Sequence, residues 1–124
     1  MADEHMHLMT ARTEATQYMQ HVNEALAAPD YDEMRHHVQE AMEFGQRAMD
    51  HLEEALNIAE DPELSDSIEE AVHHLSMSIE QGDQSLESLE EEAEDYVSEM
   101  RRHGQQSLEF IDGAVASLAS EEAI

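Results

Sequence analysis

Apolar residues recur every three or four positions along most of the chain, the spacing that places them on one side of an α-helix. The first run of this kind extends from Leu8 to Leu26 and the second from Met34 to Ala59. A third runs from Leu64 to Leu118 without an intervening proline. Nothing in the chain suggests a sheet, so the pattern predicts an all-α protein.

Two breaks that contain proline separate these runs. After Pro29, Asp30 stands three residues before Glu33, an arrangement typical of a capping pair at a helix N-terminus. At the second break, Asp61 can cap a helix whose first residue is Pro62, where the missing N–H costs nothing. The breaks predict helices over about 4–28 and 31–60, with a third helix from about 63.

The third apolar run is too long for one helix of the same bundle. It would form a helix of about 57 residues and about 85 Å, roughly twice the length of its neighbours. We therefore expect a reversal inside it, and Gly82-Asp83 is the best chemical signal, giving helices over about 63–82 and 84–120. The acidic region 90–92 is the alternative and would give four helices of more equal length.

The expected architecture is an up-down four-helix bundle with short loops. The chain has 124 residues, which suits a single domain spanning 1–124.

The charge of the chain excludes several classes of partner. It has 31 acidic residues against 5 basic ones, all arginine, for a formal net charge of -26. Binding to nucleic acid or to an anionic membrane surface requires clustered basic residues, so neither is expected. An acidic surface without lysine is the usual composition of proteins that work in high salt, and we expect a salt-adapted source.

Cysteine is absent, which excludes disulfides, thiolate zinc sites and iron–sulfur clusters. No apolar run reaches the length of a membrane span, and the start Met-Ala-Asp-Glu-His lacks the basic and apolar regions of a signal peptide. We therefore expect no membrane insertion.

Histidine and methionine, which both bind soft or borderline metal ions, each occur nine times. Four histidines each begin a similar segment, in which an apolar residue follows the histidine. Three of the four segments have a glutamate three positions after the histidine, namely Glu24, Glu40 and Glu54. The segments are His21-Val-Asn-Glu-Ala-Leu26, His37-Val-Gln-Glu-Ala-Met42, His51-Leu-Glu-Glu-Ala-Leu56 and the degenerate His74-Leu-Ser-Met-Ser-Ile79. Each histidine is predicted to lie on the flank of an apolar stripe, neither buried nor fully exposed.

An imidazole and a carboxylate three or four residues apart stand one helical turn apart and can share one ion. This spacing occurs throughout the repeat and again around Glu70 and His103. The candidate metal ligands are His21, Glu24, His37, Glu40, His51, Glu54, Glu70, His74 and His103. Across the interface of the second and third helices, His51 is the expected neighbour of His73 or His74. The run His5-Met6-His7-Leu8-Met9 also suits copper.

The pattern His-Leu/Val-x-Glu-Ala-Leu/Val along a short helical bundle resembles the small metal-binding protein family, His-rich periplasmic proteins associated with copper and other divalent metals. His21 to Leu26 is similar to one repeat of that family, and the segment from His74 to Ile79 with Gly82-Asp83 resembles a repeat followed by its turn. The resemblance covers residues 20–103 in pieces. It implies metal uptake or buffering through His21, His37, His51 and His74, and a periplasmic location.

The leading hypothesis is a non-catalytic protein that binds copper, or else nickel or zinc, at several sites of His plus Glu. The first alternative is a structural or partner-binding acidic bundle. The second is a di-iron protein of the ferritin-like type, suggested by Glu33-x-x-His36 and Glu70-x-x-His73, although these residues lie off the apolar stripes. The chain has no nucleophile arrangement and no nucleotide-binding motif, so we do not expect an enzyme.

Overall fold

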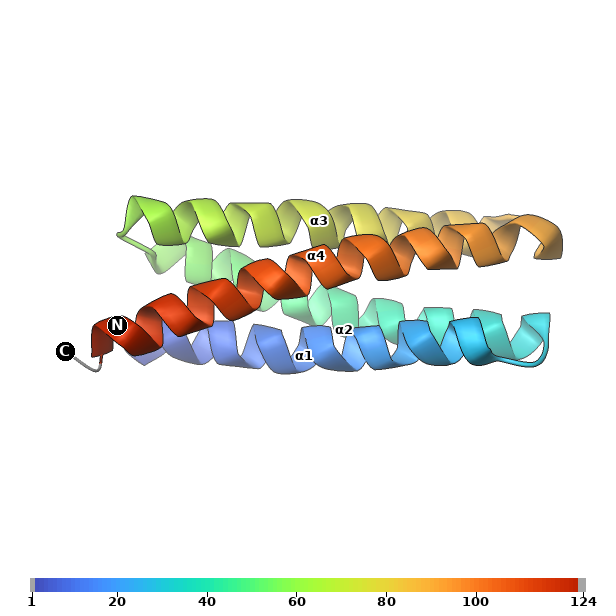
Figure 1. Ribbon diagram of the computed structural model, residues 1–124, viewed down its shortest axis with the longest axis horizontal. Helices are drawn as coiled ribbons and strands as arrows, with labels where there is room; N and C mark the ends of the chain where they lie inside the picture. Colours follow the sequence, from blue (N-terminus) through green and yellow to red (C-terminus); the bar gives the residue numbers. More distant parts are fainter. Residues whose placement is uncertain (1, 123–124) are drawn as a thin grey trace.

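A computed structural model describes residues 2–122 of the protein, and it consists of four long helices joined by short connections. They are α1 (Ala2–Ala27), α2 (Tyr31–Ile58), α3 (Pro62–Glu87) and α4 (Glu90–Glu122). The helices run up and down beside one another, with α4 ending near the start of α1 (Figure 1). The predicted all-α four-helix bundle is confirmed.

The two predicted capping residues begin their helices as expected. The Asp30 carboxylate accepts a hydrogen bond from the backbone N–H of Glu33 at 2.8 Å and caps α2. The Asp61 carboxylate accepts one from the N–H of Glu63 at 3.1 Å, and Pro62 occupies the first turn of α3. Each cap satisfies a backbone donor that the first helical turn leaves without an intrahelical partner.

The prediction that the chain reverses at Gly82-Asp83 is wrong. The helix α3 continues through Gly82 to Glu87, and α4 begins at Glu90, in the acidic region that was the alternative. Gly82 is buried, and a Cβ atom there would lie 2.9 Å from the Cε atom of Met100. The glycine therefore allows α3 and α4 to pack closely and does not end a helix.

The bundle consists of two similar hairpins, α1 with α2 and α3 with α4. Each helix packs most extensively on its hairpin partner. The sequence of buried, half-buried and exposed positions over residues 11–30 is repeated position by position over residues 71–90. Both connections between hairpin partners lie at the same end of the molecule, opposite the connection of α2 to α3 (Figure 1). The two halves thus share one packing pattern despite differing in sequence.

The two hairpins meet around the fully buried ring of Tyr18. Its hydroxyl lies 2.5 Å from the Ser78 Oγ, which donates its own hydrogen to the carbonyl oxygen of Met100 at 2.6 Å. Tyr18 is therefore the donor in the first bond. Burial raises the pKa of the Tyr18 hydroxyl, which stays protonated and able to donate. The chain of hydrogen bonds joins α1, α3 and α4 in the core.

Candidate metal centres

Histidines line the seam between α1 and α2, because they lie on the flanks of the apolar stripes as predicted. His21, His37 and His51 are all half-buried. In this position each imidazole ring is partly covered by the neighbouring side chains and partly accessible to solvent. The seam brings histidines of α1 next to histidines of α2, and two groups of possible ligands result.

The first group, here called the His21 group, contains His21 of α1 with His37 and Glu40 of α2. One possible ligand atom from each residue lies within 4.8 Å of the other two. The Glu40 Oε2 lies 3.4 Å from the His21 Nδ1. Glu24, which lies one turn beyond His21, places its Oε2 3.1 Å from the His37 Nδ1 and 3.7 Å from the His21 Nδ1. Two imidazoles and the Glu40 carboxylate therefore converge at one point of the seam, and the Glu24 carboxylate lies beside both rings.

Aromatic stacking fixes the ring of His21 in this group. It lies between the rings of His37 and Phe44, at centroid distances of 6.0 and 5.3 Å. Outside the group, the His36 Nε2 lies 2.6 Å from the Glu40 Oε1 and holds that carboxylate from the solvent side. Such outer contacts orient metal ligands in known sites.

The second group, here called the His7 group, contains His7 of α1 with His51 and Glu54 of α2. The two Nδ1 atoms lie 3.3 Å apart, the separation of about 3.3 Å that two nitrogens bound to one tetrahedral zinc ion would have. The Glu54 Oε2 lies 3.1 Å from the His7 Nε2. One possible ligand atom from each of the three residues lies within 4.8 Å of the other two. The close contact of Glu54 is with the Nε2 atom of His7, whereas the Nδ1 atom of His7 faces His51.

The two groups are the same arrangement displaced by two heptads along the antiparallel seam. His7 stands fourteen residues before His21, and His51 fourteen residues after His37. In both groups the glutamate stands three residues after the histidine of α2. Since a helix rises 1.5 Å per residue, the groups lie about 21 Å apart.

Two ring nitrogens of the His21 group lack hydrogen-bond partners among the described residues. The Nδ1 atoms of His21 and His37 are buried, and neither makes a hydrogen bond of acceptable geometry, although carboxylate oxygens lie near both. An unpaired buried polar atom is costly. A bound cation would satisfy both nitrogens, and the two nearby carboxylates would balance its charge.

The remaining predicted ligands lie in the other hairpin. His74 of α3 stacks against His103 of α4 with ring centroids 6.3 Å apart, so the sequence identified both members of a third histidine pair. The Glu70 Oε2 lies 3.6 Å from the His74 Nε2. Within residues 2–122, these three do not come together as a group of three ligand atoms, unlike the His7 and His21 groups.

One predicted neighbour is wrong, and the structure adds one candidate ligand, His7, to those predicted from the sequence. His51 faces His7 across α1 and α2, not His73 or His74, because α2 packs mainly on α1. The sequence pattern indicated His7 only as part of the run from His5 to Met9. Its helix separates the members of that run, with Met6 exposed and His7 turned toward α2. The heptad spacing of His7 from His21 was the signal that could have identified it.

The residues behind the di-iron hypothesis do not meet in the core. Glu33, His36, Glu70 and His73 are all exposed.

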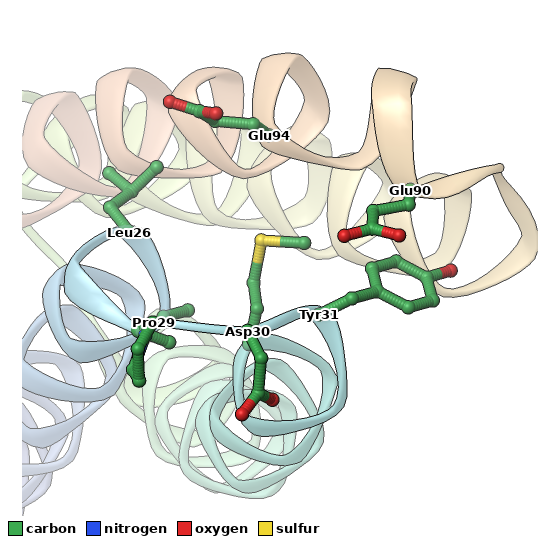
Figure 2. A pocket seen from close by; sticks show the side chains of 9 residues that line it. Leu26, Pro29, Asp30, Tyr31, Glu90 and Glu94 are labelled. Atoms are coloured by element: carbon green, nitrogen blue, oxygen red, sulfur yellow. The ribbon is translucent and has the colours of Figure 1, made fainter.

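A pocket at the end of the bundle is also separate from the histidine groups. It lies where the α1–α2 connection faces the start of α4, and Figure 2 shows Glu90 beside the ring of Tyr31. Its lining residues, all within the described range, include no histidine.

The buried position of His103 predicts a pH dependence of stability. Burial, with Arg102 nearby, lowers the pKa of His103 below its ordinary value of 6.5, outweighing the opposing effect of Glu99. The unfolded chain therefore binds this proton more readily, and stability falls as the pH drops through 6.5 toward the folded pKa. Urea unfolding at pH 7.5 and 5.5 should show a smaller loss for His103→Gln than for the unmodified protein. The exposed His73→Gln serves as control, and equal losses in all three proteins would contradict this account.

Comparisons of the chain with protein-family models, curated proteins and solved structures find no match. Across residues 2–122, none of the helices combines the length and apolar character needed to cross a membrane. The assignment of function therefore rests on the geometry of the histidine groups.

Proposed function

We propose that this protein binds transition-metal ions reversibly at the His21 and His7 groups and serves as a non-catalytic metal buffer. The observation that carries the proposal is the His21 group, in which two imidazoles and the Glu40 carboxylate converge within 4.8 Å. Mixed nitrogen and oxygen ligands of this kind suit zinc, nickel and divalent copper. At equal geometry divalent copper binds most tightly of the three, so copper is the preferred ion.

The exposure of the ligands supports exchange of the ion with solvent. The side chains of Glu24, Glu40 and Glu54 are 54, 41 and 60% exposed, whereas the facing histidines are largely covered. An ion can therefore enter from the carboxylate side without separation of the helices. A buffer needs such access, in contrast to a structural ion enclosed by the fold.

The resemblance to the small metal-binding protein family supports the same function. His21 and His37, which match the family's repeat, contribute to one group, and His51 contributes to the other. The periplasmic location implied by that resemblance belongs to the proposal as well.

Calorimetric titration of the metal-free protein with copper at pH 7.5 and pH 5 tests the proposal. We expect two equivalents to bind at the α1–α2 seam at pH 7.5, and affinity to fall steeply by pH 5, because the ligand imidazoles must be neutral and their unperturbed pKa is about 6.5.

The acidic surface attracts divalent cations without specificity, so the titration is run with excess magnesium, which competes for carboxylates but poorly for imidazole. Heats that are absent, or that are equal at both pH values, would rule out histidine-based binding. The protein would then be a structural acidic bundle.

A further inference from the structure

The side chains that surround the His21 and His7 groups differ, although the two groups share one arrangement of ligands. The groups are related by a shift of fourteen residues along each helix, so each neighbour of one group has a counterpart at the other. Three neighbours of the His21 group have counterparts of another chemical kind. His36 corresponds to Asp50, Phe44 to Ile58 and Glu24 to Thr10.

The Glu40 carboxylate of the His21 group has a contact on each of its oxygens. His36, one turn before Glu40 on α2, places its Nε2 2.6 Å from the Oε1. The Oε2 lies 3.4 Å from the His21 Nδ1. A hydrogen bond from outside the site orients a carboxylate ligand and leaves its other oxygen for the ion. His36 therefore turns one oxygen of Glu40 toward the seam.

Asp50, the counterpart of His36, cannot orient Glu54 in this way. An ionised carboxylate only accepts hydrogen bonds, and two negative charges four residues apart on a helix repel each other. The Glu54 side chain is 60% exposed, compared with 41% for Glu40. The carboxylate of the His7 group is thus less constrained.

The ring nitrogens are also used differently in the two groups. In the His21 group the carboxylates of Glu24 and Glu40 lie within 3.1 to 3.7 Å of Nδ1 atoms only. In the His7 group the Nε2 of His7 contacts Glu54, whereas its Nδ1 faces His51. One ion binds only one nitrogen of a ring, so it cannot use both of these contacts. The His7 group must therefore rearrange more on binding.

Phe44 holds the ring of His21 from the side opposite His37. The rings of His21 and Phe44 are nearly parallel, at 13°, with centroids 5.3 Å apart. The counterpart of Phe44 is Ile58, an aliphatic side chain that is 42% exposed and offers no ring for stacking. The imidazole of His7 is thus free of the stacking that fixes His21.

We propose that His36 and Phe44 are positioning residues that make the His21 group the tighter of the two sites, so that it fills before the His7 group. Ligands held in their binding orientation lose less freedom when the ion binds, and partners outside the ligand set change metal affinity by about 10–100-fold. The protein then buffers metal over two ranges of free concentration. This inference rests on the proposed function, because it concerns the order in which the proposed sites fill.

The test follows the imidazole nitrogen resonances of the 15N-labelled full chain by NMR during a zinc titration at pH 7.5 with excess magnesium. Single His→Gln variants assign the signals of His37 and His51. We expect the Nδ1 signal of His37 to move at about tenfold lower free zinc than the signals of His51. The His36 Nε2 should keep the resonance of a protonated nitrogen, which distinguishes a positioning residue from a ligand.

Exchange of the two counterparts tests the role of His36. His36→Asp should weaken zinc binding at His37 about tenfold and leave binding at His51 unchanged. Asp50→His should strengthen binding at His51. The matched control is His73→Asp, which makes the same exchange beside His74, where the two rings meet edge to edge as those of His36 and His37 do. It should change binding at neither group.

Phe44 is tested by removal and by conservative replacement of its ring. Phe44→Leu should weaken zinc binding at His37, whereas Phe44→Tyr keeps the stacked ring and should retain it. Phe110→Leu removes the ring that stacks on His74 in the other hairpin and should leave binding at His37 unchanged.

The outcomes distinguish the order of filling from metal binding itself. If zinc moves no histidine signal, the proposed function fails. If His37 and His51 respond at the same free zinc, or His51 responds first, the order of filling is overturned while the proposed function stands. An equal effect of His36→Asp and His73→Asp in folded protein would overturn the role of His36. Since the order of filling is measured on the unmodified protein, misfolding of a variant cannot obscure it.

Discussion

Replacement of His37 with alanine is expected to remove one of the two equivalents of divalent metal that we propose the α1–α2 seam binds, and replacement of His51 to remove the other. Each change takes away one of only two imidazoles in its group and leaves an incomplete ligand set. The groups share no residue and lie about 21 Å apart, so the two losses should be additive. The double variant should retain only weak binding that magnesium displaces.

Zinc titration at pH 7.5, with thermal unfolding in parallel, measures this result. Free zinc at 100 times the Kd of a site stabilises the fold by about 2.7 kcal/mol per site, so the two sites together should contribute about twice that value. This total gain should roughly halve in each single variant and disappear in the double one. His73→Ala is the matched control, since His73 is exposed and belongs to neither group. If His37→Ala and His73→Ala bind zinc with the same stoichiometry, the assignment of the His21 group is incorrect.

Substitution of Gly104 by alanine should cost about 1–3 kcal/mol of unfolding free energy, the usual effect of overpacking a core. The added Cβ would lie 2.6 Å from the Met19 Sδ and 3.1 Å from the Tyr18 Cε2. Met19 can shift, but the Tyr18 ring is held by its hydrogen bond to Ser78, so the contact cannot relax freely.

Gly113 provides the control on the same helix. A Cβ at Gly113 would meet no atom within 4 Å in the described structure, so Gly113→Ala should raise stability by about 0.5–1 kcal/mol through helix propensity alone. Urea unfolding of the three proteins gives both values. Equal effects at the two glycines would show that close packing of α4 on Tyr18 does not contribute to stability.

Local signals in the sequence were sufficient for the fold class and for most helix boundaries. The caps at Asp30 and Asp61 act within one helical turn, so they are readable without knowledge of the rest of the molecule. Gly82 was misread because a glycine that ends a helix and one that admits a neighbouring side chain give the same local pattern. Only the position of Met100 on another helix distinguishes them.

The candidate sites could be predicted from the sequence only in part, because local patterns do not show which helices are neighbours. The flank position of His21, His37 and His51 depends on periodicity within a single helix and was predicted correctly. The pairing of His7 with His51 depends on which helices are neighbours and on their register, which the repeat alone does not determine. The burial of His103 likewise depends on how α4 packs on its neighbouring helices, which the periodicity of a single helix does not determine.

The spacing of the His7 and His21 groups along one rigid seam has a spectroscopic consequence. Two unpaired electron spins held about 21 Å apart are coupled through space by their magnetic dipoles. With divalent copper in both groups, pulsed electron paramagnetic resonance should therefore report one narrow distance. That distance would correspond to two heptads of the helix, the spacing of the two groups in the sequence.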